Sequence, residues 1–423
     1  MKMRVPFITF LLLVCSAVGV HADIAGDFAG SRGVNTDNTA LLVSDLSDGS
    51  VLVEYNAEKP LIPASILKCV TNATLLSKHD VDYRFHTPVY ITGPVRDGVL
   101  EGNVMVVGSG DPSLNSRHIK NNKDICVEIA TALESRGVKE IRGRIVTDED
   151  LWDGPATPPS WARGDLPHDY GTGSHGLNFE DNASGSRSVA NPAAVFVTRL
   201  RSALNTRGIT VVGETLREED RRLLVDHESV PLDEIMRSCM MRSDNQYAEA
   251  LLRTLAVAAG HKGETEKAAA LEKSFWKKHK APMENVTIID GSGLSRQNRV
   301  TARFMEHVLR ERASDPYYAS FFPIAGEEGT LRRFLVGTPL EGYVAMKTGS
   351  MNGIQCYAGY KLDDEYAPTH IIVVMMNEMS DRAAAREALK KALLRVFFPE
   401  KYDKSDAPAD SGDSIRTESS DNN

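Results

Sequence analysis

Two side chains near the start of the sequence could together make a nucleophile. Ser65 and Lys68 are three positions apart in a segment with helical periodicity, which places them on one face of a helix. A serine hydroxyl attacks a carbonyl group only when a neighbour takes its proton, and a lysine can do so when burial or nearby cations lower its pKa. The pair therefore predicts chemistry through an acyl-enzyme on Ser65.

The spacing alone carries little weight, because Ser-x-x-Lys is expected on the order of once by chance in a chain this long. Ser274 and Lys277 are a second instance. Two further motifs supply context. Ser243-Asp244-Asn245 interrupts a helical region, and Lys347-Thr348-Gly349 lies on a strand before a glycine-containing turn. The order of the motifs and the elements that carry them raise the set above chance.

Some of these features also have purely structural interpretations. Asn245 could cap the helix that follows it, since asparagine is a preferred N-cap residue. Asp290-Gly291-Ser292-Gly293 has turn chemistry and is assigned a scaffolding role. His168 and His175 could be taken for metal ligands, but no Cys or His cluster with zinc spacing accompanies them. We predict no metal and no other cofactor.

Apolar periodicity predicts a mixed α/β (α+β) domain, with an antiparallel sheet flanked by helices. The predicted strands are 40–44, 51–55, 344–348, 355–361 and 370–376. The predicted helices are 64–76, 232–258 with a break near Ser243, 266–279 and 381–397.

The middle of the chain differs in character. Short strand-like runs broken by glycine predict an inserted strand-rich domain over 85–231, with an irregular loop over 152–176. Residues 23–84 and 232–400 would then form one discontinuous domain. Residues 401–423 are rich in Ser and Asp without apolar periodicity, which predicts a disordered tail.

The N-terminus has the features of a secretory signal. Lys2 and Arg4 precede an apolar run over 5–14, and Val20-His21-Ala22 resembles a cleavage site. We expect a signal peptide over 1–22 and a periplasmic mature chain. An uncleaved anchor is the weaker alternative, because the apolar run is short for a membrane span. Lipid anchoring at Cys15 is disfavoured, because the residue before it is a bulky valine.

Charge and cysteine content exclude some classes of protein. The net charge of −9 argues against nucleic acid as a partner, because phosphates need a basic surface. The cysteines beyond the signal could pair in three ways, but so few in a chain of this length do not make a disulfide scaffold. We predict buried free thiols at Cys69, Cys126, Cys239 and Cys356.

Beyond these motifs, the chain resembles the D-alanyl-D-alanine carboxypeptidase/endopeptidase family, the low-molecular-mass class C penicillin-binding proteins. The resemblance runs from about Ala40 to Phe398. Its collinear motifs are LIPASILK at 61–68, YRFHT at 83–87, GSGDPSL at 108–114, DGSGLSRQN at 290–298 and GTLRRF at 329–334. It implies a penicillin-binding-protein/β-lactamase-like transpeptidase domain that carries an inserted domain.

The resemblance implies a role for each catalytic residue. Ser65 would attack the carbonyl of the penultimate D-alanine while Lys68 takes its proton. The backbone N–H groups of Ser65 and Ser350 would hold the oxyanion, a task worth several kcal/mol of barrier in comparable sites. Ser243 would relay a proton to the leaving amine.

The resemblance also implies substrate-binding residues and partners. Asn245 would bind the substrate backbone, and Lys347 and Thr348 would hold the terminal carboxylate, with Gly349 and Ser350 next on the same strand. A charged Lys347 near Lys68 would help to keep the latter neutral. The implied partners are peptidoglycan stem peptides, with β-lactam antibiotics as covalent inhibitors.

Two departures from the family pattern fall in the insert. Relatives carry a long strand-rich stretch after the counterpart of Leu177-Asn178-Phe179, whereas here only 180–190 intervenes before the next shared segment. Family substrate contacts also come from a loop that here holds Asp148, Asp150 and Trp152. Acids there would suit the free amine of a diamino acid, but a solvated charge run is an equal alternative.

Two other functions remain as alternatives. A β-lactamase would use the same acylation with fast deacylation, although the chain has no Glu-x-x-Leu-Asn element. A non-catalytic peptidoglycan-binding scaffold is disfavoured because all three motifs are intact. The sequence leaves open the choice between carboxypeptidase and endopeptidase activity, the diamino acid and the oligomeric state.

Overall fold

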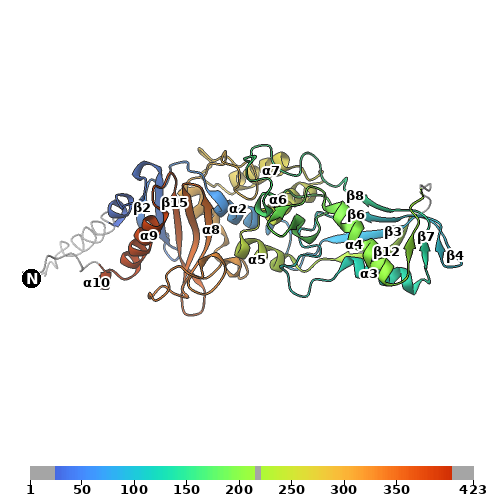
Figure 1. The fold of residues 1–423 in the computed structure, drawn as a ribbon. Helices are drawn as coiled ribbons and strands as arrows, with labels where there is room; N and C mark the ends of the chain where they lie inside the picture. The colour runs from blue at the N-terminus through green and yellow to red at the C-terminus, as the bar shows by residue number, and fades with distance from the viewer. Residues whose placement is uncertain (1–23, 215–220, 403–423) are drawn as a thin grey trace, which may run out of the picture.

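The computed structural model describes residues 24–214 and 221–402. The predicted signal peptide, Cys15 and the tail beyond 402 lie outside the described residues. Helix α10 (Pro399–Tyr402) continues into the first two residues of the segment predicted as tail. Figure 1 shows an elongated molecule with β15 and α9 in one half, β3, β4 and β7 in the other, and α5, α6 and α7 between them. Within the described ranges, no helix is both long and apolar enough to cross a bilayer.

A five-stranded sheet joins the two ends of the chain in the order β13, β14, β15, β1, β2, with every neighbouring pair antiparallel. β1 pairs with β15 along its whole length, from Thr39 opposite Met376 to Asp45 opposite His370. The predicted hairpin and the three C-terminal strands are confirmed. The strands are β1 (Thr39–Asp45), β2 (Val51–Tyr55), β13 (Val344–Met351), β14 (Ile354–Leu362) and β15 (Pro368–Met376).

Helices cover both faces of this sheet. In β15, Ile371 and Val373 pack into one apolar cluster with residues of α2, α6 and α8, whereas Ile372 and Val374 pack into another with α9. This alternation is the period of two that a strand buried on both faces requires. The helices are α2 (Leu67–Leu75), α5 (Leu232–Arg242), α6 (Asn245–Ala258), α7 (Thr265–Lys278), α8 (Ala302–Arg312) and α9 (Arg382–Phe397).

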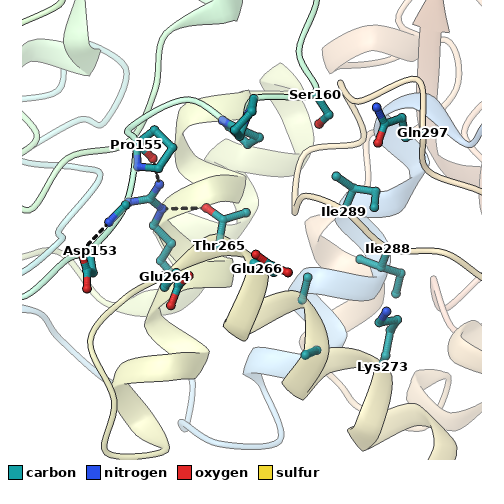
Figure 2. A pocket seen from close by; sticks show the side chains of 16 residues that line it. Asp153, Pro155, Ser160, Glu264, Thr265, Glu266, Lys273, Ile288, Ile289 and Gln297 are labelled. Atoms are coloured by element: carbon teal, nitrogen blue, oxygen red, sulfur yellow. Dashed lines mark hydrogen bonds between the residues drawn. The ribbon is translucent and has the colours of Figure 1, made fainter.

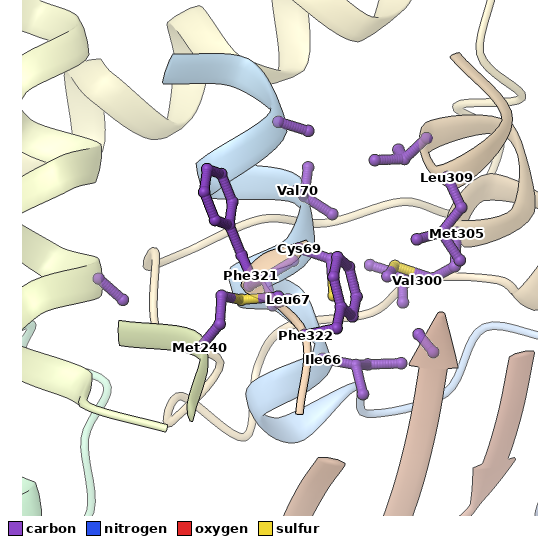
Figure 3. Packing of buried hydrophobic residues seen from close by; sticks show 14 of the residues in the cluster. Ile66, Leu67, Cys69, Val70, Met240, Val300, Met305, Leu309, Phe321 and Phe322 are labelled. Atoms are coloured by element: carbon purple, nitrogen blue, oxygen red, sulfur yellow. The ribbon is translucent and has the colours of Figure 1, made fainter. Parts of the chain in front are cut away.

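Helix α2 lies at the centre of the larger apolar cluster. It follows a 3-10 turn, η2 (Ala64–Ile66), and all of its residues are buried. Figure 3 shows Leu67 and Val70 of α2 among Met240 of α5, Met305 of α8 and the neighbouring Phe322. A helix buried on every side has its position fixed by packing.

The segment between β3 (His86–Ile91) and β12 (Arg222–Glu228) contains helices as well as strands. These two strands pair with each other, so the chain enters and leaves this segment at the same place. Helices α3 (Ile125–Ser135) and α4 (Pro192–Thr206) pack into its core. The strand-rich character predicted for this segment did not include these two helices, although Asp124 and Asn191 cap them as their residue types favour.

The remaining strands of this segment are short. They are β4 (Val95–Arg96), β5 (Val99–Leu100), β6 (Val104–Val107), β7 (Glu140–Ile141), β8 (Ile145–Asp148), β9 (Ala183–Ser184), β10 (Arg187–Ser188) and β11 (Thr210–Val211). β12, β3, β6 and β8 form one sheet, β11, β7, β5 and β4 form another, and β9 and β10 make a small hairpin.

The cysteines of the described residues are buried free thiols, as predicted. Burial raises the pKa of Cys69, Cys239 and Cys356 to about 12. They therefore stay protonated and weakly nucleophilic at neutral pH.

Helix α9 offers a test of the core on the outer face of the sheet. Leu393 is fully buried, so Leu393→Ala should lower the free energy of unfolding by about 2–5 kcal/mol through lost burial and the cavity left behind. Lys391→Ala, at an exposed position of the same helix, should change it by less than about 0.5 kcal/mol. Urea unfolding measures both, and equal values would contradict the packing of α9.

Candidate active site

The backbone around Ser65 is approached closely by two other segments. Ala64 has a φ of 48°, a left-handed conformation that costs a non-glycine residue strain energy. A Cβ at Gly349 would lie 2.7 Å from the carbonyl oxygen of Pro63 and 3.0 Å from the amide nitrogen of Ser65, and a Cβ at Gly293 would overlap the Ala64 carbonyl. Glycine at these two positions therefore lets β13 and the 290–293 turn pack directly against the serine.

Lys68 makes three hydrogen-bond contacts within a fully buried site. Its Nζ donates to Asn245 Oδ1 at 2.6 Å and to the carbonyl oxygen of Ser292 at 2.7 Å, and it lies 3.0 Å from Ser65 Oγ. Burial lowers the pKa of Lys68. A neutral amine can satisfy both acceptors with its two N–H groups and direct its lone pair at the Ser65 hydroxyl. The geometry thus suits a base for Ser65.

Asn245 serves this site and does not cap α6. Asp244 is the cap, because its side chain accepts a hydrogen bond from the amide of Tyr247 at 3.2 Å. The capping interpretation of Asn245 is therefore wrong. Its Oδ1 accepts from Lys68, and its Nδ2 donates to the carbonyl oxygen of Tyr170 at 2.7 Å.

Ser243 lies at the break between α5 and α6. It closes α5 with φ 60° and ψ 39°, a left-handed conformation, and it lines the same pocket as Ser65. The predicted helix break is confirmed. The chain reversal brings Ser243 to the pocket lining, while the Asn245 side chain two residues later bonds to Lys68.

Lys347 belongs to β13, the strand that forms the opposite wall, and its side chain does not line the pocket. It is fully buried, and its Nζ donates to the carbonyl oxygen of Thr348 at 2.7 Å. Burial, assisted by the charge of Lys68, lowers the pKa of Lys347 to about 7. Thr348 and Ser350 face the pocket, where Thr348 Oγ1 donates to Thr330 Oγ1 at 2.8 Å.

The edge of β13 beside Ser65 pairs with no other strand in the described part of the chain. β13 is an outer strand of the sheet, and its Val344 carbonyl and Met346 amide bond to segment 323–325, on the side away from β14. Because this direction alternates along a strand, the Thr348 carbonyl and the Ser350 N–H point to the same free edge. The strand can therefore pair with an extended ligand and can offer the Ser350 N–H to a carbonyl oxygen.

The pocket in front of Ser65 has a volume of about 290 Å³. It brings together Ser65, Ser243, Thr348 and Ser350 from the predicted set, while Lys68, Asn245 and Lys347 lie behind its walls. Its lining residues are Ser65, Ser243, Thr330, Thr348, Ser350, Gln355, Tyr357, Arg382 and Arg386. Hydroxyl groups dominate this lining, as polar recognition of a peptide requires.

Asp148 and Trp152, predicted to touch substrate, are not among these lining residues. Trp152 is buried under the guanidinium of Arg253, which lies 5.0 Å from its ring centroid. Asp148 ends β8 and accepts a hydrogen bond from the amide of Asp150 at 3.0 Å. The loop folds back onto α6 and α7, so the tryptophan contributes packing there.

A larger cavity of about 530 Å³ lies beside this loop and the start of α7. Figure 2 shows it between Pro155 and Glu264 on one side and Ser160, Ile288 and Gln297 on the other. None of the predicted catalytic residues lines it. Its lining is therefore separate from the Ser65 chemistry.

The 290–293 turn does more than the scaffolding predicted for it, because the Ser292 carbonyl accepts from Lys68. The Asp290 carboxylate accepts from the amides of Gly293 and Ser295 at 2.9 and 2.6 Å and from Trp161 Nε1 at 2.9 Å. The side chain of Asp290, the first residue of the turn motif, therefore holds the turn in place.

Glu249 also holds this turn and was missed by sequence analysis. Its Oε1 accepts from the amides of Gly291 and Ser292 at 3.0 and 2.8 Å. Burial, then the nearby Asp290, raises the pKa of Glu249 to about 7. The available signal was its position four residues after Asn245, on the same face of α6.

A family model matches most of the chain. The model of the D-Ala-D-Ala carboxypeptidase 3 (S13) family matches residues 22–185 and 180–396. The two matches meet where η4 (Glu180–Asn182) and the β9–β10 hairpin stand. This is the region in which the sequence is shorter than the family pattern.

Relatives and solved structures agree with that match. The chain is 25% identical to a D-alanyl-D-alanine carboxypeptidase of Actinomadura sp. (strain R39), over 76% of this chain and 74% of the relative. It is 23% identical to the D-alanyl-D-alanine carboxypeptidase DacB of Haemophilus influenzae, over 83% of this chain and 88% of the relative.

Two solved structures share the fold. Penicillin binding protein 4 of H. influenzae has a TM-score of 0.76 at 22% identity, covering 90% of this chain and 98% of that chain. A predatory endopeptidase of Bdellovibrio bacteriovorus, in complex with an immunity protein, has a TM-score of 0.54 at 17% identity, covering 84% of this chain and 92% of that chain. The predicted fold class is confirmed.

The Glu249 carboxyl should make stability depend on pH. Its pKa is raised from 4.5 to about 7, so the stability that the neutral carboxyl gives the folded state is lost as the pH rises through 7. Glu249→Gln stays neutral, and its unfolding free energy relative to wild type should increase from pH 5 to pH 8 by on the order of 3 kcal/mol. Urea unfolding at both pH values tests this. Glu266→Gln, at an exposed position of α7, should show no such trend, and a flat difference for Glu249→Gln would contradict the assignment.

Proposed function

This chain belongs to the D-Ala-D-Ala carboxypeptidase 3 (S13) family, and we propose that it hydrolyses D-alanyl-D-alanine ends or cross-links of peptidoglycan stem peptides through an acyl-enzyme on Ser65. The observation that carries this proposal is the buried Lys68 Nζ, which lies 3.0 Å from Ser65 Oγ and is held by Asn245 and Ser292. The lone pair of a neutral lysine in this position points at the Ser65 hydroxyl and can accept its proton.

Acylation follows from this arrangement. Ser65 Oγ forms a bond to the carbonyl carbon of the penultimate D-alanine as its proton passes to Lys68. The negative charge that develops on the carbonyl oxygen is met by the N–H groups of Ser65 and Ser350. The C–N bond then breaks, and a proton reaches the leaving amine through the Ser243 hydroxyl. The product is an ester on Ser65 and a free amine.

Deacylation uses the same base a second time. A water molecule gives a proton to the neutral Lys68 as its oxygen attacks the ester carbonyl, and the Ser65 oxygen leaves with a proton returned by the lysine. The same N–H groups hold the oxyanion in this second step. No group other than those of the chain and water is needed.

The substrate backbone and its carboxylate have matching groups in the pocket. An extended peptide would pair with the free edge of β13, with the Asn245 amide on the opposite side. The carboxylate of the leaving group would bind the Thr348 hydroxyl, with Lys347 behind it. A terminal carboxylate and a carboxylate within a cross-link can both be placed there.

We also propose that β-lactams acylate Ser65. The H. influenzae penicillin binding protein 4 has been solved with a β-lactam, and the Bdellovibrio endopeptidase has been solved acylated by penicillin G. A β-lactam offers a strained amide and a carboxylate to the same groups.

The place of action proposed for the chain is the periplasm. The support is the signal-like pattern over 1–22, together with a substrate that lies outside the cytoplasmic membrane. Residues 85–231 are proposed as an inserted domain, since β3 and β12 meet at its two ends.

Covalent labelling tests the nucleophile. The protein should bind a fluorescent penicillin at one site, and Ser65→Ala should lose the label. Ser274→Ala is the matched control, since Ser274 belongs to the second Ser-x-x-Lys pair and is exposed. Equal labelling of Ser65→Ala and wild type would refute the assignment, an unlabelled wild type would favour a scaffold, and rapid release of hydrolysed penicillin would indicate a β-lactamase.

The pH profile tests the coupling of the two buried lysines. Lys347 is charged below about pH 7 and repels a proton on Lys68, so Lys347→Met should raise the pKa of Lys68. The acidic limb of the kcat/KM profile should move to higher pH by up to about one unit, and kcat/KM for carboxylate-bearing substrates should fall on the order of tenfold. Lys361→Met, on β14, should leave the profile in place. An unmoved acidic limb in Lys347→Met would disprove the coupling.

A further inference from the structure

Two arginines of α9 form one wall of the Ser65 pocket. Arg382 and Arg386 are four residues apart on one face of the helix, and both line the pocket with Ser65 and Thr348. The lining contains no Asp or Glu, although the chain as a whole carries a net charge of −9. The pocket is therefore a local concentration of positive charge on an acidic protein.

Helix stability does not account for a cation at Arg382. It is the first residue of α9, and the positive end of the helix dipole disfavours a positive side chain there. The neighbouring Asp381 carboxylate is engaged elsewhere, since it caps the helix through the amides of Ala383 and Ala384 and lies 3.4 Å from Arg32. Neither the helix dipole nor the Asp381 cap therefore explains a cation at Arg382.

Contacts with the protein hold both guanidinium groups in place. Arg382 Nη2 donates to the carbonyl oxygen of Met351 at 2.6 Å. Arg386 lies 5.5 Å from the ring centroid of Phe334 and hydrogen bonds to the side chain of Tyr357. A pre-organised guanidinium loses little freedom when it binds a carboxylate, and its remaining N–H groups can bind in a bidentate manner.

Lys347 carries only part of its positive charge at neutral pH. It is buried behind β13 and bonded to the Thr348 carbonyl, and its pKa is about 7. An arginine stays charged at any pH at which the protein is folded. The pocket's permanent positive charge therefore comes from α9.

We infer that Arg382 and Arg386 form a subsite for a further carboxylate of the leaving group, beyond the one next to the scissile amide. This inference rests on the proposed function and names its preferred substrate class. A released D-alanine carries one carboxylate, which Thr348 already serves. A leaving group that is itself a stem peptide, as in a cross-link, carries more than one. The subsite therefore favours D,D-endopeptidase action on cross-linked peptides.

Binding to a chain that cannot turn over tests the subsite directly. The probes are a cross-linked stem-peptide dimer and the same dimer amidated at the leaving-stem carboxylates beyond the one adjacent to the scissile bond. Calorimetry with Ser65→Ala should show amidation weakening binding by about tenfold. In Ser65→Ala/Arg382→Gln/Arg386→Gln the effect of amidation should fall below about twofold. Lys391→Gln in the Ser65→Ala background is the control and should retain the tenfold effect.

The outcomes separate this inference from the proposed function. Equal binding of the two dimers by Ser65→Ala, or an amidation effect that persists in the double glutamine variant, would overturn the subsite. Arg382→Gln alone, at an exposed position, guards against misfolding and should reduce the amidation effect about threefold. Cleavage of the unmodified dimer by wild type, followed by chromatography, reports on the proposed function independently of these binding ratios.

Discussion

The burial of Lys68 is the constraint on which the rest of the site depends. An amine removed from water loses its hydration, and its charged form becomes unfavourable unless acceptors surround it. Here the hydrogen-bond partners of Lys68 come from three separate segments: the Ser65 hydroxyl before α2, and two acceptors, Asn245 Oδ1 at the start of α6 and the Ser292 carbonyl. The fold must therefore bring these segments within hydrogen-bond distance of one nitrogen, and the core around α2 achieves this.

That convergence leaves strain in the backbone. Ala64 and Ser243 both have positive φ values without being glycine, which costs on the order of 1–3 kcal/mol each. The strain is sustained because α2 is buried on every side and the 290–293 turn is tied down by Glu249 and Asp290. The packing of α2 and the hydrogen bonds of the turn together hold the Ser65 hydroxyl in one position.

The sequence predicted what depends on local pattern. The central strands, the break at Ser243 and the Ser65–Lys68 turn all follow from spacing along the chain, and the structure contains them. It could not predict backbone acceptors, because the carbonyls of Ser292 and Tyr170 carry no residue signature. The surroundings of Trp152 also depend on long-range folding: the family resemblance placed it on a substrate-contacting loop, and the structure buries it under Arg253.

Burial lowers the pKa values of both Lys68 and Lys347, and the charge of Lys68 lowers the pKa of Lys347 further. A site that needs Lys68 neutral for catalysis must therefore weaken the positive charge that Lys347 can offer to an anionic substrate. Arg382 and Arg386 resolve this conflict, because they face the pocket from a different element and keep their charge. Separating the base from the permanent cations lets one pocket combine proton transfer with recognition of carboxylates.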